Sequence, residues 1–163
     1  MPQIEDFLPQ EIIVIDQGHG LVSFRQKEFN SNYTFWRLFT RKGYWYNNYC
    51  LNLPLENIIV HPKYKSYFLA REKFTNYAVL VNLKPFHIKR IPLDFYPHFI
   101  FSYSDYFICA STKGNILILD KKGNIIKNLN LNKEIINLKN LNDQRVLVII
   151  FVDNKYHLIA LKI

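Results

Sequence analysis

Short apolar runs bounded by polar turn residues recur along this chain of 163 residues. Phe, Tyr, Ile and Val are frequent in the runs and favour the pleated surface of a sheet, while the helix formers Ala, Glu and Met are scarce. One set of runs recurs about 40 residues further on, a period typical of repeat architectures built of short strands. The matching sets are Tyr67–Ala70, Ala78–Asn82 and Ile88–Ile91, followed by Tyr106–Cys109, Ile116–Asp120 and Ile125–Leu129.

The pattern predicts four units of three or four strands each. The first unit comprises Ile12–Ile15, Leu21–Arg25, Tyr33–Phe39 and Tyr44–Leu51. The second comprises Ile58–Val60, Tyr67–Arg71, Tyr77–Asn82 and His87–Ile91. The third comprises His98–Ser102, Tyr106–Ser111, Asn115–Asp120 and Ile125–Leu129. The fourth comprises only Ile135–Leu138, Val146–Val152 and Tyr156–Leu161.

We therefore expect a single all-β domain over residues 1–163, a small propeller-like array of about four units. Gly and Asn between the runs, as in Thr112–Asn115 and Asp120–Asn124, supply the positive φ that tight hairpins need. Because the fourth unit lacks a strand, we expect the N-terminal segment Ile4–Leu8 to complete it and close the ring. Strands of period two with frequent turns also suit a β-sandwich or a barrel.

The unit length resembles that of the WD40-like β-propeller repeat proteins over nearly the whole chain. Asn82 and Asp120 stand where such repeats carry the Asp of a Trp-Asp dipeptide, and Gly18-His19 matches their Gly-His pair, but the Trp-Asp dipeptide itself is missing. WD40-like rings have about seven blades, so a four-bladed ring and a half-ring completed by another subunit both stay open. The resemblance implies a frame that holds partners and not a reaction centre.

The chain is basic, with a net charge of +8 and a pI near 9.4. A positive surface favours nucleic acid or anionic membranes as partners. However, Phe, Tyr, Ile, Asn and Lys are all abundant, and their codons are AT-rich. An AT-rich genome explains the lysines equally well, as a solvated surface without a specific role.

The two cysteines, Cys50 and Cys109, lie in apolar strands without the paired spacing of a zinc or redox motif, so we expect buried free thiols. The sequence lacks the basic start and apolar run of a secretory signal. Its longest apolar run, Val146–Val152, is far shorter than the ~20 residues of a membrane-spanning helix. We expect an intracellular, reducing compartment, with an organelle included.

Motifs for catalysis are missing. The sequence contains no phosphate-binding glycine loop, no His-Glu-x-x-His and no Gly-x-Ser-x-Gly, and its five histidines are scattered. Asp16 and His19 are spaced so that a carboxylate could orient an imidazole, but a turn explains them equally well. We expect no enzyme activity, no cofactor, no metal and no small-molecule substrate.

The most unusual local feature is the aromatic and basic stretch from Tyr33 to Tyr49. As a hairpin that turns at Arg41-Lys42-Gly43, it places Phe35, Arg37 and Phe39 on one face and Thr34, Trp36 and Leu38 on the other. It reads as a protein interface, as a stacking platform for single-stranded RNA, or as ordinary cross-strand aromatic pairing. The candidate partner-binding residues are Trp36, Arg37, Arg41, Lys42, Tyr44, Trp45 and Tyr46.

Two functional hypotheses follow. In the first, the chain is a non-catalytic protein-interaction scaffold, a small propeller-like subunit that binds other protein subunits in a larger assembly. In the second, it is an RNA-binding accessory protein of a ribonucleoprotein such as an organellar ribosome. Loss of binding at high salt would favour the second hypothesis.

Overall fold

A computed structural model describes residues 7–14, 19–26, 34–40, 42, 45–83, 85–142 and 145–162. These residues form β-strands and turns and contain no helix, so the all-β prediction is confirmed. The strands fall into four antiparallel sheets, in which each strand pairs with the next one along the chain. Every predicted strand has a counterpart in the structure. Most ends differ by up to three residues, but the first strand starts five positions early, at Phe7, and the strand predicted over Ile135–Leu138 extends to Asn142.

The first sheet contains β1 (Phe7–Val14), β2 (His19–Gln26), β3 (Thr34–Thr40) and β4 (Trp45–Leu51). The second contains β5 (Leu55–Val60), β6 (Tyr67–Glu72), β7 (Tyr77–Leu83) and β8 (Phe86–Pro92). The third contains β9 (Phe99–Tyr103), β10 (Tyr106–Ala110), β11 (Asn115–Leu119) and β12 (Ile125–Asn130). The fourth contains β13 (Glu134–Asn142), β14 (Arg145–Val152) and β15 (Lys155–Lys162).

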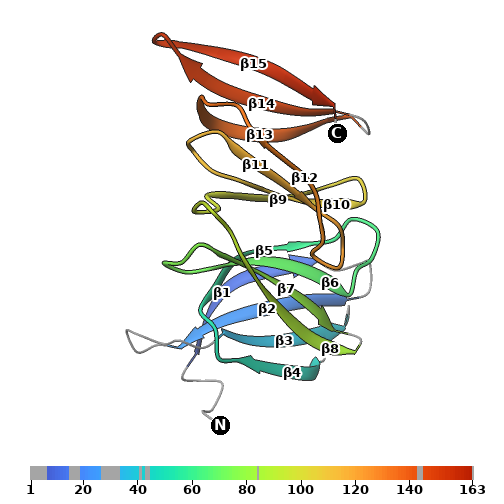
Figure 1. Cartoon of the computed structure of the whole chain (residues 1–163). Coiled ribbons are helices and arrows are strands. Elements are labelled where there is room, and N and C mark those ends of the chain that lie inside the picture. The colour runs from blue at the N-terminus through green and yellow to red at the C-terminus, as the bar shows by residue number, and fades with distance from the viewer. Residues whose placement is uncertain are drawn as a thin grey trace.

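The sheets follow one another in chain order, with the first two at the bottom of Figure 1 and β13–β15 at the top. Their first strands touch in series, since β1 contacts β5, β5 contacts β9 and β9 contacts β13. This is the packing of propeller blades, in which the first strand of each blade is innermost. The array does not close, because the first and fourth sheets lie at opposite ends of the stack.

Three apolar layers separate the four sheets. Trp36 and Leu38 meet Phe68 and Val81 between the first two sheets. The next layer joins the second sheet to the third, and the last joins the third to the fourth. Because an inner sheet is covered on both sides, neighbouring positions of β7 are buried in succession, which explains its continuous apolar run Ala78–Val81.

Tight turns connect the strands, as predicted from Gly and Asn. Asp153 and Asn154 join β14 to β15 with φ values of 52° and 61°. A two-residue hairpin loop needs positive φ at both positions so that its twist matches the right-handed twist of the strands. Gly114 has a φ of 107° in the turn between β10 and β11, and Gly123 has a φ of 81° in the turn between β11 and β12.

The predicted closure of the ring by Ile4–Leu8 is corrected at Phe7 and Leu8. These two residues pair with Gln26 and Arg25 in the first sheet, where β1 starts five positions before the predicted Ile12. Residues 4–6 lie outside the described residues. In the described part of the chain, β15 has no strand on its outer side, and lysines stand at both ends of this edge strand.

Candidate protein-interaction surface

Trp36, one of the predicted partner-binding residues, lies in the core between the first two sheets. Its side chain is fully buried, and its ring packs against Phe68 with the centroids 5.9 Å apart. On the same side of β3, Thr34 Oγ1 donates a hydrogen bond to the Leu53 carbonyl at 2.6 Å and accepts one from the Leu55 N–H at 2.8 Å. Trp36 therefore holds two sheets together and is not accessible to a partner.

The other six predicted residues are only partly described. Arg37 is half-buried and alternates with Trp36 and Leu38, so it lies on the opposite face of β3. Lys42 is exposed in a turn. Trp45 and Tyr46 belong to β4, in which Trp45 pairs with Phe39, but their side chains are not described. Arg41 and Tyr44 lie outside the described residues. Their assignment to partner binding stays a prediction.

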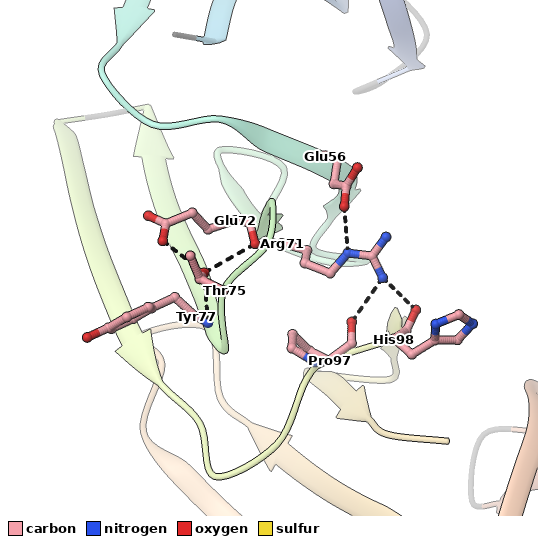
Figure 2. A network of polar contacts seen from close by, with 7 residues as sticks. All are labelled: Glu56, Arg71, Glu72, Thr75, Tyr77, Pro97 and His98. Carbon is pink, nitrogen blue, oxygen red and sulfur yellow. Dashed lines mark hydrogen bonds and ion pairs between the residues drawn. The ribbon is translucent and has the colours of Figure 1, made fainter. Parts of the chain in front are cut away.

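Arg71 has its hydrogen-bond partners within the fold. Figure 2 shows its guanidinium between two segments. Nε donates to Glu56 Oε1 at 3.0 Å, and an Nη donates to the carbonyl oxygens of Pro97 and His98 at 3.2 and 2.9 Å. The guanidinium also lies over the Tyr96 ring, 5.2 Å from its centroid. Arg71 therefore fixes the connection between β8 and β9 to the second sheet.

Arg90 is a second arginine with an internal role. Its Nε and Nη atoms donate to the two carboxylate oxygens of buried Glu72 at 3.0 and 2.8 Å. Thr75 Oγ1 donates a further bond to the same carboxylate at 2.8 Å, and the guanidinium lies 4.0 Å from the centroid of Tyr77. The hydrogen bonds that Arg90 donates to Glu72 raise the pKa of Arg90 above its ordinary value. This pair joins β6 to β8 across β7.

His61 is a buried polar residue between the second and third sheets. Its Nδ1 accepts the backbone N–H groups of Lys63 and Tyr64 at 3.1 and 3.0 Å, so Nε2 carries the proton and donates to the Asp105 carbonyl at 2.9 Å. Burial lowers the pKa of His61, and the neighbouring charges of Lys121 and Lys65 act in the same direction. The folded chain therefore favours the neutral form of the His61 imidazole.

A lysine–tyrosine cluster, formed by Lys63, Tyr64, Lys65 and Lys121, lies beside His61 on the surface. Lys121 Nζ stands 3.5 Å from the centroid of the Tyr64 ring, and Lys63 Nζ stands 5.7 Å from it. Lys63 also approaches Asp105 at 3.9 Å. The cluster joins the loop after β5 to the turn after β11, and it is a described surface that combines cations with an accessible aromatic ring.

The fourth sheet carries an apolar face that no other described sheet covers. We call it the open face and define it as Leu147, Ile149, Phe151, Tyr156, Leu158 and Ala160. Strand register places these residues in three cross-strand pairs, Leu147 with Ala160, Ile149 with Leu158, and Phe151 with Tyr156. The alternating residues Val146, Val148 and Ile150 point the other way, into the core shared with the third sheet. The rings of Phe151 and Tyr156 lie 5.0 Å apart.

The open face corresponds to a face that is covered in the preceding sheets. Its central pair, Ile149 with Leu158, corresponds to Ile108 with Ile118 in the third sheet and to Leu69 with Leu80 in the second. Those four residues are 0–5% exposed because the following sheet packs on them, whereas Leu158 is 67% exposed. All three pairs consist of aliphatic side chains. They differ in that a following sheet covers the pairs of the second and third sheets but not the pair of the fourth.

Sequence reasoning identified the strands of the open face but not the face itself. A signal was present, because Val146–Val152 is apolar at every position, which is typical of a strand covered on both sides. The sequence could not show that another described sheet covers only one of the two faces of this strand. The candidate site therefore shifts from the hairpin of the first sheet to the fourth sheet.

Groups for catalysis or metal binding are sparse. The described residues contain no cluster of three His, Cys, Asp or Glu side chains suited to a metal ion. Asp16 lies outside the described residues, and of His19 only the strand position in β2 is described. Cys109 is a buried free thiol whose pKa burial raises to about 12, so it is a poor nucleophile. No helix in the described part of the chain is suited to crossing a membrane.

No protein-family model matches the chain, and no curated protein sequence matches it. Solved structures do. The chain is similar to BBS1N, solved in complex with ARL6DN, with a TM-score of 0.65 and 9% identity over 96% of this chain and 53% of that one. It is similar to the Neurospora crassa Pan2 WD40 domain, with a TM-score of 0.58 and 18% identity over 86% of this chain and 41% of that one.

Similarity extends to a Pyrococcus horikoshii acylaminoacyl peptidase, with a TM-score of 0.56 and 8% identity over 98% of this chain and 33% of that one. At such low identity the comparisons show the fold alone. The chain spans about half the length of the first two structures that it matches. Four sheets packed in series, each built from consecutive antiparallel strands, together with these similarities, show that the chain has the β-propeller fold of WD40-like domains, in an array that does not close.

Proposed function

We propose that the chain is a non-catalytic scaffold subunit that binds another protein through the open face of the fourth sheet. The observation that carries this proposal is the exposure of Leu158, at a position where the second and third sheets bury their equivalent residues. Contiguous exposed apolar surface marks interaction sites in soluble proteins. BBS1N, which has the same fold, was solved in complex with a protein, and this supports the proposal.

The energetics favour a protein partner. Fully burying a Leu or Phe side chain stabilises an interface by about 1.5–3 kcal/mol relative to leaving it exposed. Tyr156 and Leu158 are 70% and 67% exposed, and Leu147, Ile149 and Phe151 are half-buried. A sheet that packs on the open face as the fourth sheet packs on the third would cover all of them. Tyr is moreover a residue enriched among interface anchors.

Leu158→Asp tests the proposal, because it places a charge at the centre of the open face without disturbing a buried residue. The matched control is Ile125→Asp in β12, where the side chain is 60% exposed outside the open face. The tagged chain is recovered from its native source and the proteins bound in stoichiometric amount are quantified. We expect Leu158→Asp to lose them at least tenfold and Ile125→Asp to retain them. Equal retention by both variants would contradict the proposal.

The lysine–tyrosine cluster favours a second candidate function, binding of single-stranded RNA. Lysines flanking an exposed aromatic ring combine phosphate attraction with base stacking, and Lys89 and Lys122 line a pocket of about 330 Å³ between the same two sheets. Fluorescence anisotropy with a labelled single-stranded RNA tests this function. Binding should weaken steeply with salt, and Tyr64→Ala should weaken it about tenfold. No binding at low salt would exclude it.

A further inference from the structure

A cavity of about 330 Å³ lies between the second and third sheets, beside the turn that joins β7 to β8. Its described lining comes from β6, β7 and β8 of the second sheet and from the turn between β11 and β12 of the third. We propose that this cavity binds a nucleotide, whose base enters it while Lys89 and Lys122 hold the phosphate. The inference goes beyond the scaffold function, because it concerns a different surface from the open face.

Strand register places the polar lining residues of the second sheet side by side. Tyr67 of β6 pairs with Asn82 of β7, and Asn82 pairs with His87 of β8. The neighbouring row on the same face contains Leu80 and Lys89, which pair with each other. Leu80 belongs to the apolar layer between the second and third sheets. The cavity therefore lies at the border of that layer, where this face of the second sheet changes from apolar to polar.

The turn between β11 and β12 forms the opposite side of the cavity. Asp120 Oδ1 accepts the Lys122 N–H at 2.9 Å, which fixes the backbone of this turn. Gly123 lies directly on the second sheet, since a Cβ there would stand 3.4 Å from Leu80 Cδ2 and 3.6 Å from Lys89 Cδ. Lys89 Nζ donates to the Lys122 carbonyl oxygen at 3.4 Å. The two lysines of the lining are therefore held at the same side of the cavity.

The charge of the cavity favours an anion. Its described lining contains Lys89 and Lys122 but no Asp or Glu. Lys121 adds a third cation, because its Nζ lies 5.8 Å from the centroid of the Tyr67 ring, which lines the cavity. The carboxylate of Asp120 accepts hydrogen bonds from within its own turn. Lysine ammonium groups form charge-assisted hydrogen bonds with phosphate oxygens, so a phosphate is the group that this side of the cavity fits.

The size and the walls of the cavity favour a nucleotide among phosphate-bearing ligands. Ligand cavities measure roughly 300–1,000 Å³, so this one holds a single ring system and not a run of bases. The side chains of Tyr67, Leu80 and Pro85 supply aromatic and apolar walls, on which the flat face of a base stacks. The exposed His87 imidazole offers hydrogen bonds to a base edge. A phosphorylated tyrosine side chain has the ring and the phosphate but no such edge.

Isothermal titration calorimetry of the purified chain with uridine monophosphate tests the proposal. We expect uridine monophosphate to bind about tenfold more tightly than uridine or inorganic phosphate, because the lysine–phosphate bonds and base stacking each contribute about that factor. Inorganic phosphate that binds as tightly as the nucleotide would indicate an adventitious ion only and would overturn the proposal. Phenyl phosphate that binds as tightly would overturn it in favour of a phosphorylated protein.

Lys89→Met locates the site, because it removes the charge and keeps the apolar part of the side chain. The matched control is Lys127→Met, since Lys127 pairs with Ile118 in the third sheet as Lys89 pairs with Leu80 in the second, but does not line the cavity. We expect Lys89→Met to weaken binding of uridine monophosphate about tenfold and Lys127→Met to change it less than about twofold. Equal losses in the two variants would overturn the proposal.

A labelled single-stranded RNA distinguishes a free nucleotide from a nucleotide within a strand. If the strand supplies the nucleotide, Lys89→Met should weaken RNA binding about tenfold in fluorescence anisotropy, and Lys127→Met should not. Binding of uridine monophosphate without binding of RNA would support the cavity and identify a free nucleotide, while the RNA-binding function would fail. RNA binding that depends on Tyr64 but not on Lys89, without binding of uridine monophosphate, would refute the cavity and retain the RNA-binding function.

Discussion

His61 makes the stability of the fold depend on pH. Its pKa in the folded chain lies below the ordinary value of 6.5, mainly because of burial, with Asp105 acting against this and Lys121 and Lys65 acting with it. The unfolded chain therefore binds a proton at a higher pH than the folded chain does. The contribution of His61 is fully present above about pH 6.5 and is lost as the pH falls toward the folded-state pKa.

We expect the free energy of unfolding to fall between pH 7 and pH 5, by about 1.4 kcal/mol for each unit by which the pKa is lowered. Urea titrations at several pH values measure this. His61→Gln should be less stable at pH 7 and should flatten the pH dependence of the free energy of unfolding. An identical slope in wild type and His61→Gln would show that other groups control the titration.

Gly114 is required by its backbone conformation and by its surroundings. A Cβ at this position would stand 2.8 Å from the Lys133 carbonyl oxygen and 3.0 Å from the Asn132 nitrogen, both backbone atoms, at a φ of 107°. Gly114→Ala should therefore destabilise the fold by about 2 kcal/mol, measured by chemical denaturation.

Gly123→Ala is the matched comparison for Gly114→Ala. Its Cβ would meet the Ile91 Cδ1 atom at 2.8 Å, which is the movable end of a side chain. The expected cost is about 1 kcal/mol. A larger loss at Gly123 than at Gly114 would mean that the backbone contact is not the cause.

Trp36 illustrates what could not be predicted for single residues. The alternation of β3 correctly placed Thr34, Trp36 and Leu38 on one face. Nothing in the local sequence shows whether that face meets solvent, a partner or another sheet, because burial depends on residues far along the chain, here Phe68. The same limit applies to Arg71 and Arg90, whose acidic partners are set by the packing of strands.

At the scale of elements, the pair of Arg90 and Glu72 stabilises the second sheet by joining β6 and β8 across β7. Glu72 is 3% exposed, so removing its cation leaves a buried carboxylate whose remaining side-chain hydrogen bond comes from Thr75. Arg90→Met should cost about 2 kcal/mol of unfolding free energy, less than for a fully buried pair because the Arg90 side chain is 45% exposed.

Chemical denaturation of three variants distinguishes this pair from a general effect of charge. Lys127→Met, on the exposed strand β12, removes a cation from the surface and should change the stability by less than about 0.5 kcal/mol. Adding Glu72→Gln to Arg90→Met should recover part of the loss, since the buried charge is then removed. A double variant less stable than Arg90→Met would contradict this explanation.

The strands themselves could be predicted from local patterns. Apolar runs and turn residues defined every strand, including β12 and β13 in the polar stretch after Lys127, because hairpins depend on neighbouring residues. The start of β1 at Phe7 was missed, since Pro9 and Gln10 interrupt the apolar pattern where the structure has an irregular register between Pro9 and Glu11. A local irregularity of this kind leaves no clear periodic signal.

At the scale of the molecule, the arrangement of sheets follows from which faces are apolar. The period of about 40 residues predicted repeated sheets, and the structure has them in chain order. The expected closure within the chain was not predictable from this period, because ring closure depends on the angle between successive sheets. That angle is set by side-chain volumes in the three apolar layers.

Binding of another protein through the open face should raise the thermal stability of the chain. Because only the folded chain binds that protein, the midpoint of thermal unfolding should rise by about 4 °C for each tenfold increase in the concentration of the partner above saturation. Differential scanning fluorimetry of the purified chain mixed with the recovered partner measures this. Leu158→Asp should have a midpoint that does not change with partner concentration, and a wild-type midpoint that is also constant would argue against binding linked to folding.

Lysines at both ends of β15 disfavour the pairing of this edge strand with the same strand of another copy. Lys155 and Lys162 bracket a strand whose outer side pairs with nothing in the described part of the molecule. Edge-to-edge pairing of two such strands would bring four ammonium groups together, and this repulsion discourages growth of fibrils from newly made chains. The charges do not obstruct contact through the face. The fourth sheet can therefore bind a partner on its open face, while polymerisation through the edge strand β15 is disfavoured.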